Sequence, residues 1–133
     1  MAHCSSHTVF INSLNQAWQQ ADWASLATMY HPDVVLVPPD LGANLVGWTA
    51  ILQTYQDFAA RATLHGFRVL NVEAHVFAHS QVVHSDFEAD YSIDANRSVD
   101  TGTEIYVLES GECGQPVIIW RQQIIARAQS VEP

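Results

Sequence analysis

Residues 47–76, GWTAILQTYQDFAARATLHGFRVLNVEAHV, contain the point at which the chain changes its pattern of apolar residues. Up to Ala62 these residues recur every three or four positions, as in an amphipathic helix, and from Phe67 they follow strand spacing. The helical pattern extends back to Phe10 and the strand pattern forward to Ile125. Because the helices come first in the chain, we expect a strongly bent sheet that wraps around them.

Working outward from this junction, the sequence predicts three helices, a short early strand and four long strands. The helices are expected over Phe10–Ala21, over Trp23–Tyr30 after an N-cap at Asp22, and from Gly47 to Ala62, with Gly66 placed to stop the third. The strands are expected at Val34–Val37, with Leu45-Val46 as its candidate partner, and at Phe67–Val76, Gln81–Tyr91, Thr101–Glu109 and Val117–Ile125. Ala78–Ser80 and Ser110–Pro116 are predicted as turns, and Asp94–Ser98 as a polar connection.

The long strands carry apolar residues on both faces. In Thr101–Glu109, for example, Ile105 lies on one face and Tyr106 on the other. Strands joined by short turns are antiparallel, and a sheet with two partly apolar faces needs two covers. We therefore expect an α+β fold, with three N-terminal helices packed in the concave face of a strongly curved, mainly antiparallel sheet. A second copy of the protein is expected to cover the other face as a homodimer through the sheet.

The composition limits the possible partners. A chain of 133 residues is expected to form one domain, with its core over residues 8–126. Fourteen carboxylates against five arginines and no lysine give a net charge of −9. Such a chain is expected to bind neither nucleic acid nor an anionic membrane surface, because both depend on basic side chains.

Location is predicted from the absence of targeting signals. The N-terminus has no basic region followed by an apolar run of signal length, and no stretch approaches 18 apolar residues. A cytoplasmic location is the resulting expectation. Cys4 and Cys113 are then expected to be reduced thiols.

The order of the predicted elements resembles the nuclear-transport-factor-2-like superfamily, which has a cone-shaped α+β fold. The resemblance spans roughly residues 8 to 126 and rests on an ordered set of residues rather than on one motif. These are Trp18, Asp22, Trp23, Leu26, Met29, Tyr30, Pro32 and Asp33 for the first two helices, Gly47, Ile51, Tyr55 and Phe58 for the third, and Gly102–Gly111 for the penultimate strand and turn. The chain is most similar to small bacterial members that resemble polyketide cyclases and ketosteroid isomerases.

This resemblance implies a dimer with one apolar pocket per subunit and no cofactor. Ketosteroid isomerases need a carboxylate base, a tyrosine and a protonated acid. Counted from Asp22, the tyrosine position falls on Leu14, the base position on Pro38 and the acid position on Glu104. With two roles vacant, that isomerisation is not expected unless a small loop shift brings Asp40 into the role of the base.

Glu104 is the best single candidate for an acid in the pocket. Against Tyr106 and the helical aromatics its carboxyl group would be desolvated, which would raise its pKa. The alternative is that Glu104 faces solvent or pairs with an arginine, since one bulge reverses the facing of a strand.

A second candidate lies on the strand Gln81–Tyr91, where His84, Asp86, Glu88 and Asp90 share one face. A histidine two residues from a carboxylate can form a pair of base and orienting group, here His84 and Asp86. Alternation of this kind is also typical of a solvated sheet face, and that interpretation is the simpler one.

The last strand offers one long polar side chain to the pocket, whichever face points inward. Arg121 could anchor a carboxylate ligand or form a structural ion pair with Asp86, Glu88 or Glu104. Trp120 and Gln122 lie on the opposite face.

Aromatic residues from the helices and strands are expected to converge and to line an apolar site, or simply to pack as core. They are Trp18, Tyr30, Trp48, Tyr55, Phe58 and Tyr106. The seven histidines show no spacing that would build a closed metal site, so no metal is expected.

The leading functional hypothesis is a pocket for a small, mostly apolar molecule, with cofactor-free isomerase, dehydratase or cyclase chemistry if the protein is an enzyme. The competing hypothesis is a non-catalytic module for ligand carriage or association. The aromatic lining favours the first, and the missing tyrosine and base favour the second.

Overall fold

The computed structural model describes residues 7–40, 42–110 and 115–131. Three helices and six strands form in the order expected for the family fold. The helices are α1 (His7–Gln19), α2 (Trp23–Met29) and α3 (Trp48–Arg61), and the strands are β1 (Tyr30–Val37), β2 (Leu45–Val46), β3 (Ala62–Val76), β4 (Ser80–Ile93), β5 (Asn96–Ser110) and β6 (Pro116–Val131).

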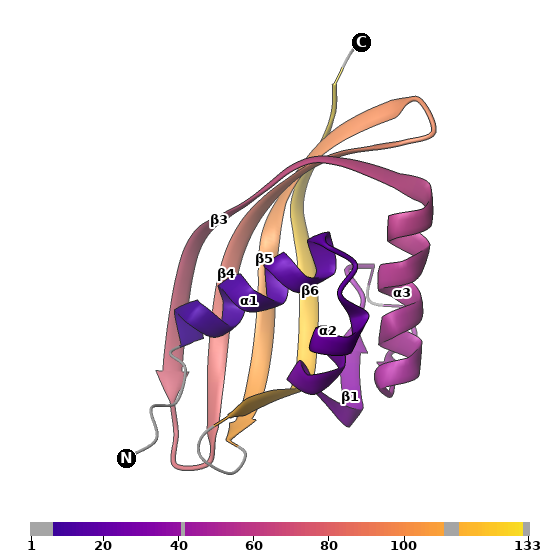
Figure 1. The fold of residues 1–133 in the computed structure, drawn as a ribbon. Helices are drawn as coiled ribbons and strands as arrows, with labels where there is room; N and C mark the ends of the chain where they lie inside the picture. Colours follow the sequence, from indigo (N-terminus) through magenta and orange to yellow (C-terminus); the bar gives the residue numbers. More distant parts are fainter. Residues whose placement is uncertain (1–6, 41, 111–114, 132–133) are drawn as a thin grey trace.

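The six strands make one open, mainly antiparallel sheet in the order β2-β1-β6-β5-β4-β3. Among the strand pairs in the described part of the chain, only β1 and β6 run parallel to each other. The long strands bend, and α1 and α2 lie across the hollow side of the sheet while α3 stands beside β1 (Figure 1). This arrangement confirms the predicted α+β cone, including the pairing of Leu45-Val46 with the first strand.

Two helix starts follow directly from the local sequence. The Asp22 carboxylate caps α2 by accepting bonds from the backbone N and the Oγ of Ser25, at 3.2 and 2.7 Å, as an N-cap aspartate does. Gly47 precedes α3 with a φ of +96°, in a region that residues with a Cβ rarely adopt. Both boundaries agree with the predicted ones.

The predicted role of Gly66 as the residue that stops α3 is wrong. The helix ends at Arg61 and the chain passes directly into β3, so that Gly66 lies within the strand at a shift of register between Leu64 and Gly66. A strand bulge, rather than a helix stop, is therefore the role of this glycine.

The predicted connection Asp94–Ser98 is also too long. Ile93 pairs with Asn96, so a two-residue turn of Asp94 and Ala95 joins β4 to β5, and Asp94 has a φ of +53°. Such tight turns favour residues that tolerate positive φ, among them aspartate. The strands consequently extend to 14 and 15 residues, and this extra length places Asp100 well inside β5.

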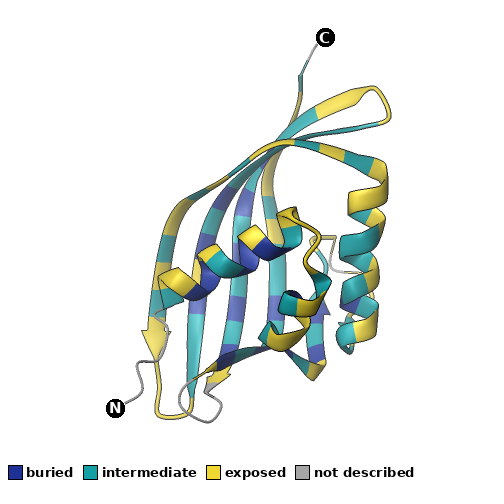
Figure 2. Cartoon of the chain, in the orientation of Figure 1, coloured by how far each residue is buried: buried dark blue, intermediate teal, exposed yellow. Residues whose placement is uncertain are grey.

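Alternation along β5 decides which residues face the helices. The even-numbered residues from Asp100 to Leu108 are buried, and the odd-numbered residues between them are only partly so. Figure 2 shows dark blue, buried segments on the strands behind α1. The helical side of the core includes Phe10, Ile11, Leu14, Leu26 and Ile51. The hollow face of the sheet therefore carries both the core and any internal site.

Gly102 is required where β6 bulges against β5. A Cβ at this position would lie 2.1 Å from the backbone oxygen of Ile124 and 3.1 Å from Cζ of Phe87. The ladder shifts register here, because Thr101 pairs with Arg127 and Gly102 with Ile125. Bulges of this kind bend a strand and increase its twist, which helps the sheet to wrap.

Some predictions fall outside the described residues. They concern Cys4, Cys113 and most of the turn Ser110–Pro116. Within the described ranges, no helix is both long and apolar enough to cross a membrane.

Candidate functional site

A cavity of about 460 Å³ lies between the helices and the hollow face of the sheet. Three parts of the chain line it: helices α1 and α3, the β1–β2 region, and the inner face of β3 to β6. The lining residues are Asn15, Trp18, Leu36, Pro38, Pro39, Leu45, Thr54, Tyr55, Phe58, Phe67, Phe87, Ala89, Tyr91, Ile93, Asp100, Glu104, Tyr106, Arg121, Gln123 and Ile125. Most are apolar or aromatic, and only Asp100, Glu104 and Arg121 are charged.

One polar end of the cavity is a buried ion pair. Arg121 donates from Nε and Nη2 to the two carboxylate oxygens of Glu104, at 2.9 and 2.8 Å. Glu104 is 7% exposed and Arg121 9% exposed. Gln123 adds a bond of 2.7 Å from its Nε2 to Oε1 of Glu104. The bidentate geometry is the strongest form of this pair, and it neutralises both charges within the cavity wall.

Two tyrosine hydroxyls complete the surroundings of Arg121. Its Nη1 donates to Tyr30 at 3.2 Å and to Tyr55 at 3.0 Å, and the two hydroxyls are themselves 2.6 Å apart. The guanidinium carbon also lies 5.4 Å from the centroid of the Tyr55 ring and 5.9 Å from that of Tyr106, a range in which cation–π attraction contributes. Most donors of Arg121 are therefore already used.

Burial keeps these groups in fixed protonation states. Desolvation raises the pKa of Tyr55 and of Tyr106 well above the usual value, although the charge of Arg121 opposes the rise in both. The pKa of Tyr30 is also raised by desolvation, and there the charge of Arg121 and the hydrogen bonds to Tyr55 and Arg121 oppose the rise. For Arg121, desolvation lowers the pKa, but Glu104 and the tyrosine hydroxyls outweigh it and leave the pKa raised. The tyrosines are therefore neutral hydrogen-bonding groups, and Arg121 stays charged.

A second polar group lies further along β5. Asp100 is 9% exposed and accepts bonds from the hydroxyl of Tyr91 at 2.6 Å and from Oγ of Ser98 at 2.8 Å. Burial and the bond to Asp100 raise the pKa of Tyr91 to about 12. Both partners of Asp100 are thus neutral donors, in contrast to the arginine that faces Glu104.

Six of the residues singled out from the sequence come together in the cavity wall. They are Trp18, Tyr55, Phe58, Glu104, Tyr106 and Arg121. Two others lie directly behind the wall: Tyr30, through its bonds to Tyr55 and Arg121, and Trp48, whose ring stacks on Tyr30 at a centroid distance of 5.1 Å. Arg121 pairs with Glu104, which is one of the three carboxylates considered for it.

Four other candidates lie away from the cavity lining. His84 is exposed and Asp86 accepts a bond from Thr103, because the inner face of β4 is taken by Val83, Ser85 and Phe87. The same alternation places Trp120 and Gln122 on the face opposite Arg121. Among the described residues, the side chain of Asp86 bonds to Thr103 and not to His84, so the predicted pair of His84 and Asp86 does not form.

The positions compared with ketosteroid isomerases are now located. Leu14 is fully buried in the core, and Pro38 lines the cavity without an ionisable group. Asp40 is exposed and accepts a bond from the backbone N of Gly42 at 2.9 Å. The structure therefore places no carboxylate at the position of the base.

Asp100, Tyr91 and Gln123 are cavity residues that the sequence reasoning did not select. The signal was present in β5, because Asp100, Gly102 and Glu104 follow the same alternation. The predicted strand began at Thr101, one residue too late to include Asp100. Gln123 could also have been predicted from the sequence, because it lies on the same face of its strand as Arg121.

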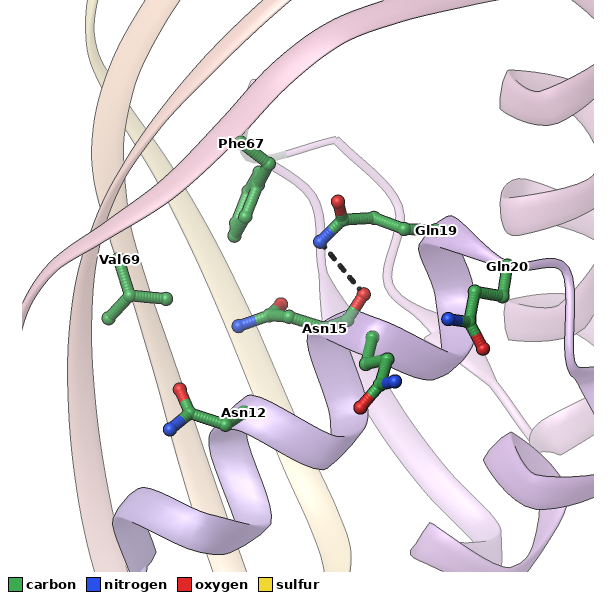
Figure 3. Close-up of a pocket in the computed structure, with 7 residues that line it drawn as sticks. Asn12, Asn15, Gln19, Gln20, Phe67 and Val69 are labelled. Atoms are coloured by element: carbon green, nitrogen blue, oxygen red, sulfur yellow. Dashed lines mark hydrogen bonds between the residues drawn. The ribbon is translucent and has the colours of Figure 1, made fainter.

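A second, more open hollow lies between α1 and β3. It is lined by side-chain amides of α1, namely Asn12, Asn15, Gln16, Gln19 and Gln20, and by Phe67 and Val69. Figure 3 shows Asn12, Asn15 and Gln19 pointing toward the two β3 residues, with Gln19 bonded to the backbone oxygen of Asn15. None of the seven residues is charged, so this hollow offers no acid–base group. Among the described residues, no three histidine, cysteine, aspartate or glutamate side chains gather as metal ligands.

Comparison with known proteins agrees with this architecture. The family described as the SnoaL-like domain matches residues 11–113. No curated protein matches the chain. Among solved structures, a nuclear-transport-factor-2-like protein from Cytophaga hutchinsonii is 16% identical, with a TM-score of 0.73 over 87% of this chain and 92% of its own.

Two further structures show the same fold. A ketosteroid isomerase-like protein from Erwinia carotovora atroseptica is 16% identical, with a TM-score of 0.72 over 89% of this chain and 92% of its own. A hexachlorocyclohexane dehydrochlorinase is 10% identical, with a TM-score of 0.79 over 92% of this chain and 84% of its own. With 103 of its 133 residues matched, the chain belongs to the SnoaL-like domain family and has the cone-shaped fold of the nuclear-transport-factor-2-like superfamily.

Proposed function

We propose that the protein binds a small, mostly apolar molecule in the cavity between its helices and its sheet. The observation that carries this proposal is the cavity itself: about 460 Å³, with aromatic walls and a few polar groups. Ligand pockets in proteins have volumes of about 300–1,000 Å³ and this same division between apolar walls and sparse polar groups. The cavity is large enough for a ligand of two to three fused rings.

Tyr55 supplies the hydrogen bond that orients the ligand. Each tyrosine hydroxyl has one proton, and the bond between Tyr30 and Tyr55 uses only one of the two. Either hydroxyl can be the donor in that bond. When Tyr30 donates, the proton of Tyr55, which lines the cavity, is free for a ligand. A ligand with a carbonyl or ether oxygen would accept that proton, which favours ligands with one oxygen at this end.

A filled-cavity variant tests the binding. Ala89→Phe places a ring in the cavity, and Ala60→Phe makes the same change at an exposed position of α3. Titration of the bicyclic ketone 2-tetralone, followed by saturation-transfer NMR, is expected to show binding to the native protein and to Ala60→Phe, and at least a tenfold loss in Ala89→Phe. Equal binding by both variants would contradict the proposal.

The same geometry supports cofactor-free acid–base chemistry of the isomerase, dehydratase or cyclase type. When the carbonyl oxygen of a ligand accepts a hydrogen bond from Tyr55, the protons on the neighbouring carbon become more acidic. The reason is that a preorganised donor stabilises the oxyanion that forms when such a proton leaves. Exchange of the α-protons of 2-tetralone for deuterium in heavy water measures this step, with hydroxide or buffer in the solvent as the base that removes the proton and heavy water as the source of deuterium. We expect the native protein to accelerate it and Tyr55→Phe to abolish the acceleration.

A non-catalytic binding module is the second candidate, and the pairing of Glu104 favours it. Both oxygens of this carboxylate accept bonds from Arg121, and Gln123 adds a third, so Glu104 is held as a structural group. A protein that binds 2-tetralone without accelerating its exchange would match this second candidate.

We also propose that a second copy of the chain covers the outer face of the sheet. The support is the apolar content of that face, where Ile105, Val107 and Trp120 are partly exposed and Ile124 is 42% exposed. Sedimentation of the native protein is expected to show a dimer, and Ile124→Glu a monomer. A native monomer would contradict the proposal.

A further inference from the structure

We propose that Asp100 selects the ligand at the second polar end of the cavity, in favour of molecules that present a hydrogen-bond donor there and most strongly a protonated amine. This inference rests on the proposed binding function and adds the charge class of the ligand. Three observations support it. They are the hydrogen bonds of Asp100, the positions of the five arginines, and the pairing of Arg121 with Glu104.

Asp100 has acceptor capacity that the protein does not use. A carboxylate offers about four acceptor sites on its two oxygens. The structure gives Asp100 two bonds, one from the Tyr91 hydroxyl to Oδ2 and one from Oγ of Ser98 to Oδ1. Because Asp100 also lines the cavity, the remaining sites are available to a ligand.

Within the described ranges, no arginine or histidine forms an ion pair with Asp100. The five basic residues are all arginines within the described part of the chain. Arg68 pairs with Glu88, Arg97 with Asp90 and Arg121 with Glu104. Arg61 and Arg127 are exposed, and Arg127 pairs with Thr101 in the sheet, on the face opposite Asp100. A carboxylate that is nine-tenths buried without a cation favours any ligand that supplies one.

The other end of the cavity does not offset this preference. Glu104 cancels the charge of Arg121, and the tyrosines of the wall are neutral, so the three charged lining residues sum to one negative charge. The net charge of −9 on the whole chain has the same sign and adds to the attraction of cations and the repulsion of anions.

The spacing of the two ends sets the length of the ligand. Asp100 and Glu104 are four residues apart on one strand, which corresponds to about 13 Å between their backbones. Gly102 lies between them on the same face, and the ring of Phe87 packs against it. The ligand is therefore expected to have an apolar body over Phe87, an oxygen toward Tyr55 and a donor toward Asp100.

Four naphthalene probes of one shape test the preference: 2-naphthylmethylamine, 2-naphthylmethanol, 2-naphthoate and 2-methylnaphthalene. At neutral pH the amine is a cation and the carboxylate an anion. We expect the amine to bind the native protein at least tenfold more tightly than 2-naphthoate, with the alcohol between them, as measured by calorimetry or saturation-transfer NMR.

The variant Asp100→Asn is expected to reduce this ratio to about threefold or less. Asp86→Asn is the matched control, because it makes the same change of net charge on the outer face, where Asp86 also accepts a bond from a hydroxyl, that of Thr103. The control should keep the native ratio. Ser98→Ala removes one donor from Asp100 and should raise the ratio, which tests the same carboxylate without replacing it.

Several outcomes would overturn the inference. They are tighter or equal binding of 2-naphthoate by the native protein, an unchanged ratio in Asp100→Asn, or an equal loss in Asp86→Asn. Binding of 2-methylnaphthalene with no charge preference would overturn this inference and leave the proposed cavity function intact. If none of the four probes binds, the proposed function fails, and the inference with it.

Discussion

The cavity has two polar ends on the same strand, and they are built in opposite ways. At one end Glu104 faces a cation, Arg121, and each of its oxygens is occupied by strong donors. At the other end Asp100 is equally buried, and its partners among the described residues are two neutral hydroxyls. A closed set of bonds contributes to the stability of the fold, whereas an incomplete set leaves room for a ligand. Burial of a carboxylate alone therefore does not say which role it has.

Removing the cation from the closed end should have the largest effect. Arg121→Met leaves Glu104 buried without compensation, and breaking a buried pair in this way costs about 3–5 kcal/mol. The free energy of unfolding, measured with urea, is the readout. Arg68→Met is the control at an exposed pair, where about 0–1 kcal/mol is expected. Comparable losses in the two variants would remove the distinction between buried and exposed pairs.

Exchanging acid for amide at each end compares the two directly. Glu104→Gln leaves Arg121 charged and uncompensated, so we expect a loss of about 3 kcal/mol in unfolding free energy. Asp100→Asn keeps an acceptor for Tyr91 or Ser98 and removes an unpaired buried charge, so its stability should stay within about 1 kcal/mol of the native value. A larger loss in Asp100→Asn than in Glu104→Gln would reverse the assignment of roles.

Tyr55→Phe removes the hydroxyl that accepts a bond from Arg121 and is proposed to donate one to the ligand. One proton of Arg121 Nη1 loses its acceptor, while Tyr30 still serves the other. We expect a loss of about 1–3 kcal/mol in unfolding free energy, the cost of one unsatisfied buried donor. Thr54→Val at the neighbouring cavity position, whose hydroxyl bonds only within α3, should leave the binding of 2-tetralone intact, whereas Tyr55→Phe should weaken it.

The bond from Tyr91 to Asp100 should affect how the free energy of unfolding changes at alkaline pH. The pKa of Tyr91 is raised from 10.0 to about 12 in the folded protein, so the folded state keeps a proton that the unfolded chain releases from about pH 10. Unfolding free energy is therefore expected to fall between pH 10 and pH 12. Tyr30, Tyr55 and Tyr106 act in the same direction, so the measured quantity is the difference between the native protein and Tyr91→Phe. The variant should lose stability less steeply with rising pH.

Much of the fold was predictable because periodicity and capping are local properties. Asp22 and Gly47 marked the starts of α2 and α3, and the single change from helical to strand spacing gave the order of layers. Gly66 was misassigned because a glycine after a helical pattern resembles a helix stop, while here it accommodates a shift of register between two strands. That distinction depends on β4, which lies far along the sequence.

The site was predictable only in part, because it depends on strand facing and strand length. Sequence alone gave Arg121 and Trp120 on opposite faces but did not say which face was internal. The bulges of β6 and the cover of the helices decide that Arg121 faces inward. Asp100 was omitted because the tight turn at Asp94 and Ala95 lengthens both strands beyond their apolar pattern. Asp100 follows the same alternation as Gly102 and Glu104, but this signal applies only once the strand is extended past Thr101.

The glycine between the two ends has a consequence for how this protein can evolve. With β6 lying against Gly102, even a methyl group would meet the backbone oxygen of Ile124. Relief would require β6 to slide or lift, and β6 carries Arg121, so a substitution here would disturb a residue on another strand. Substitutions at Gly102 are thus expected to be disfavoured, although the residue has no side chain that could take part in binding or chemistry. In a saturation library this silent position should be among the least tolerant in the chain, ahead of many residues that line the cavity.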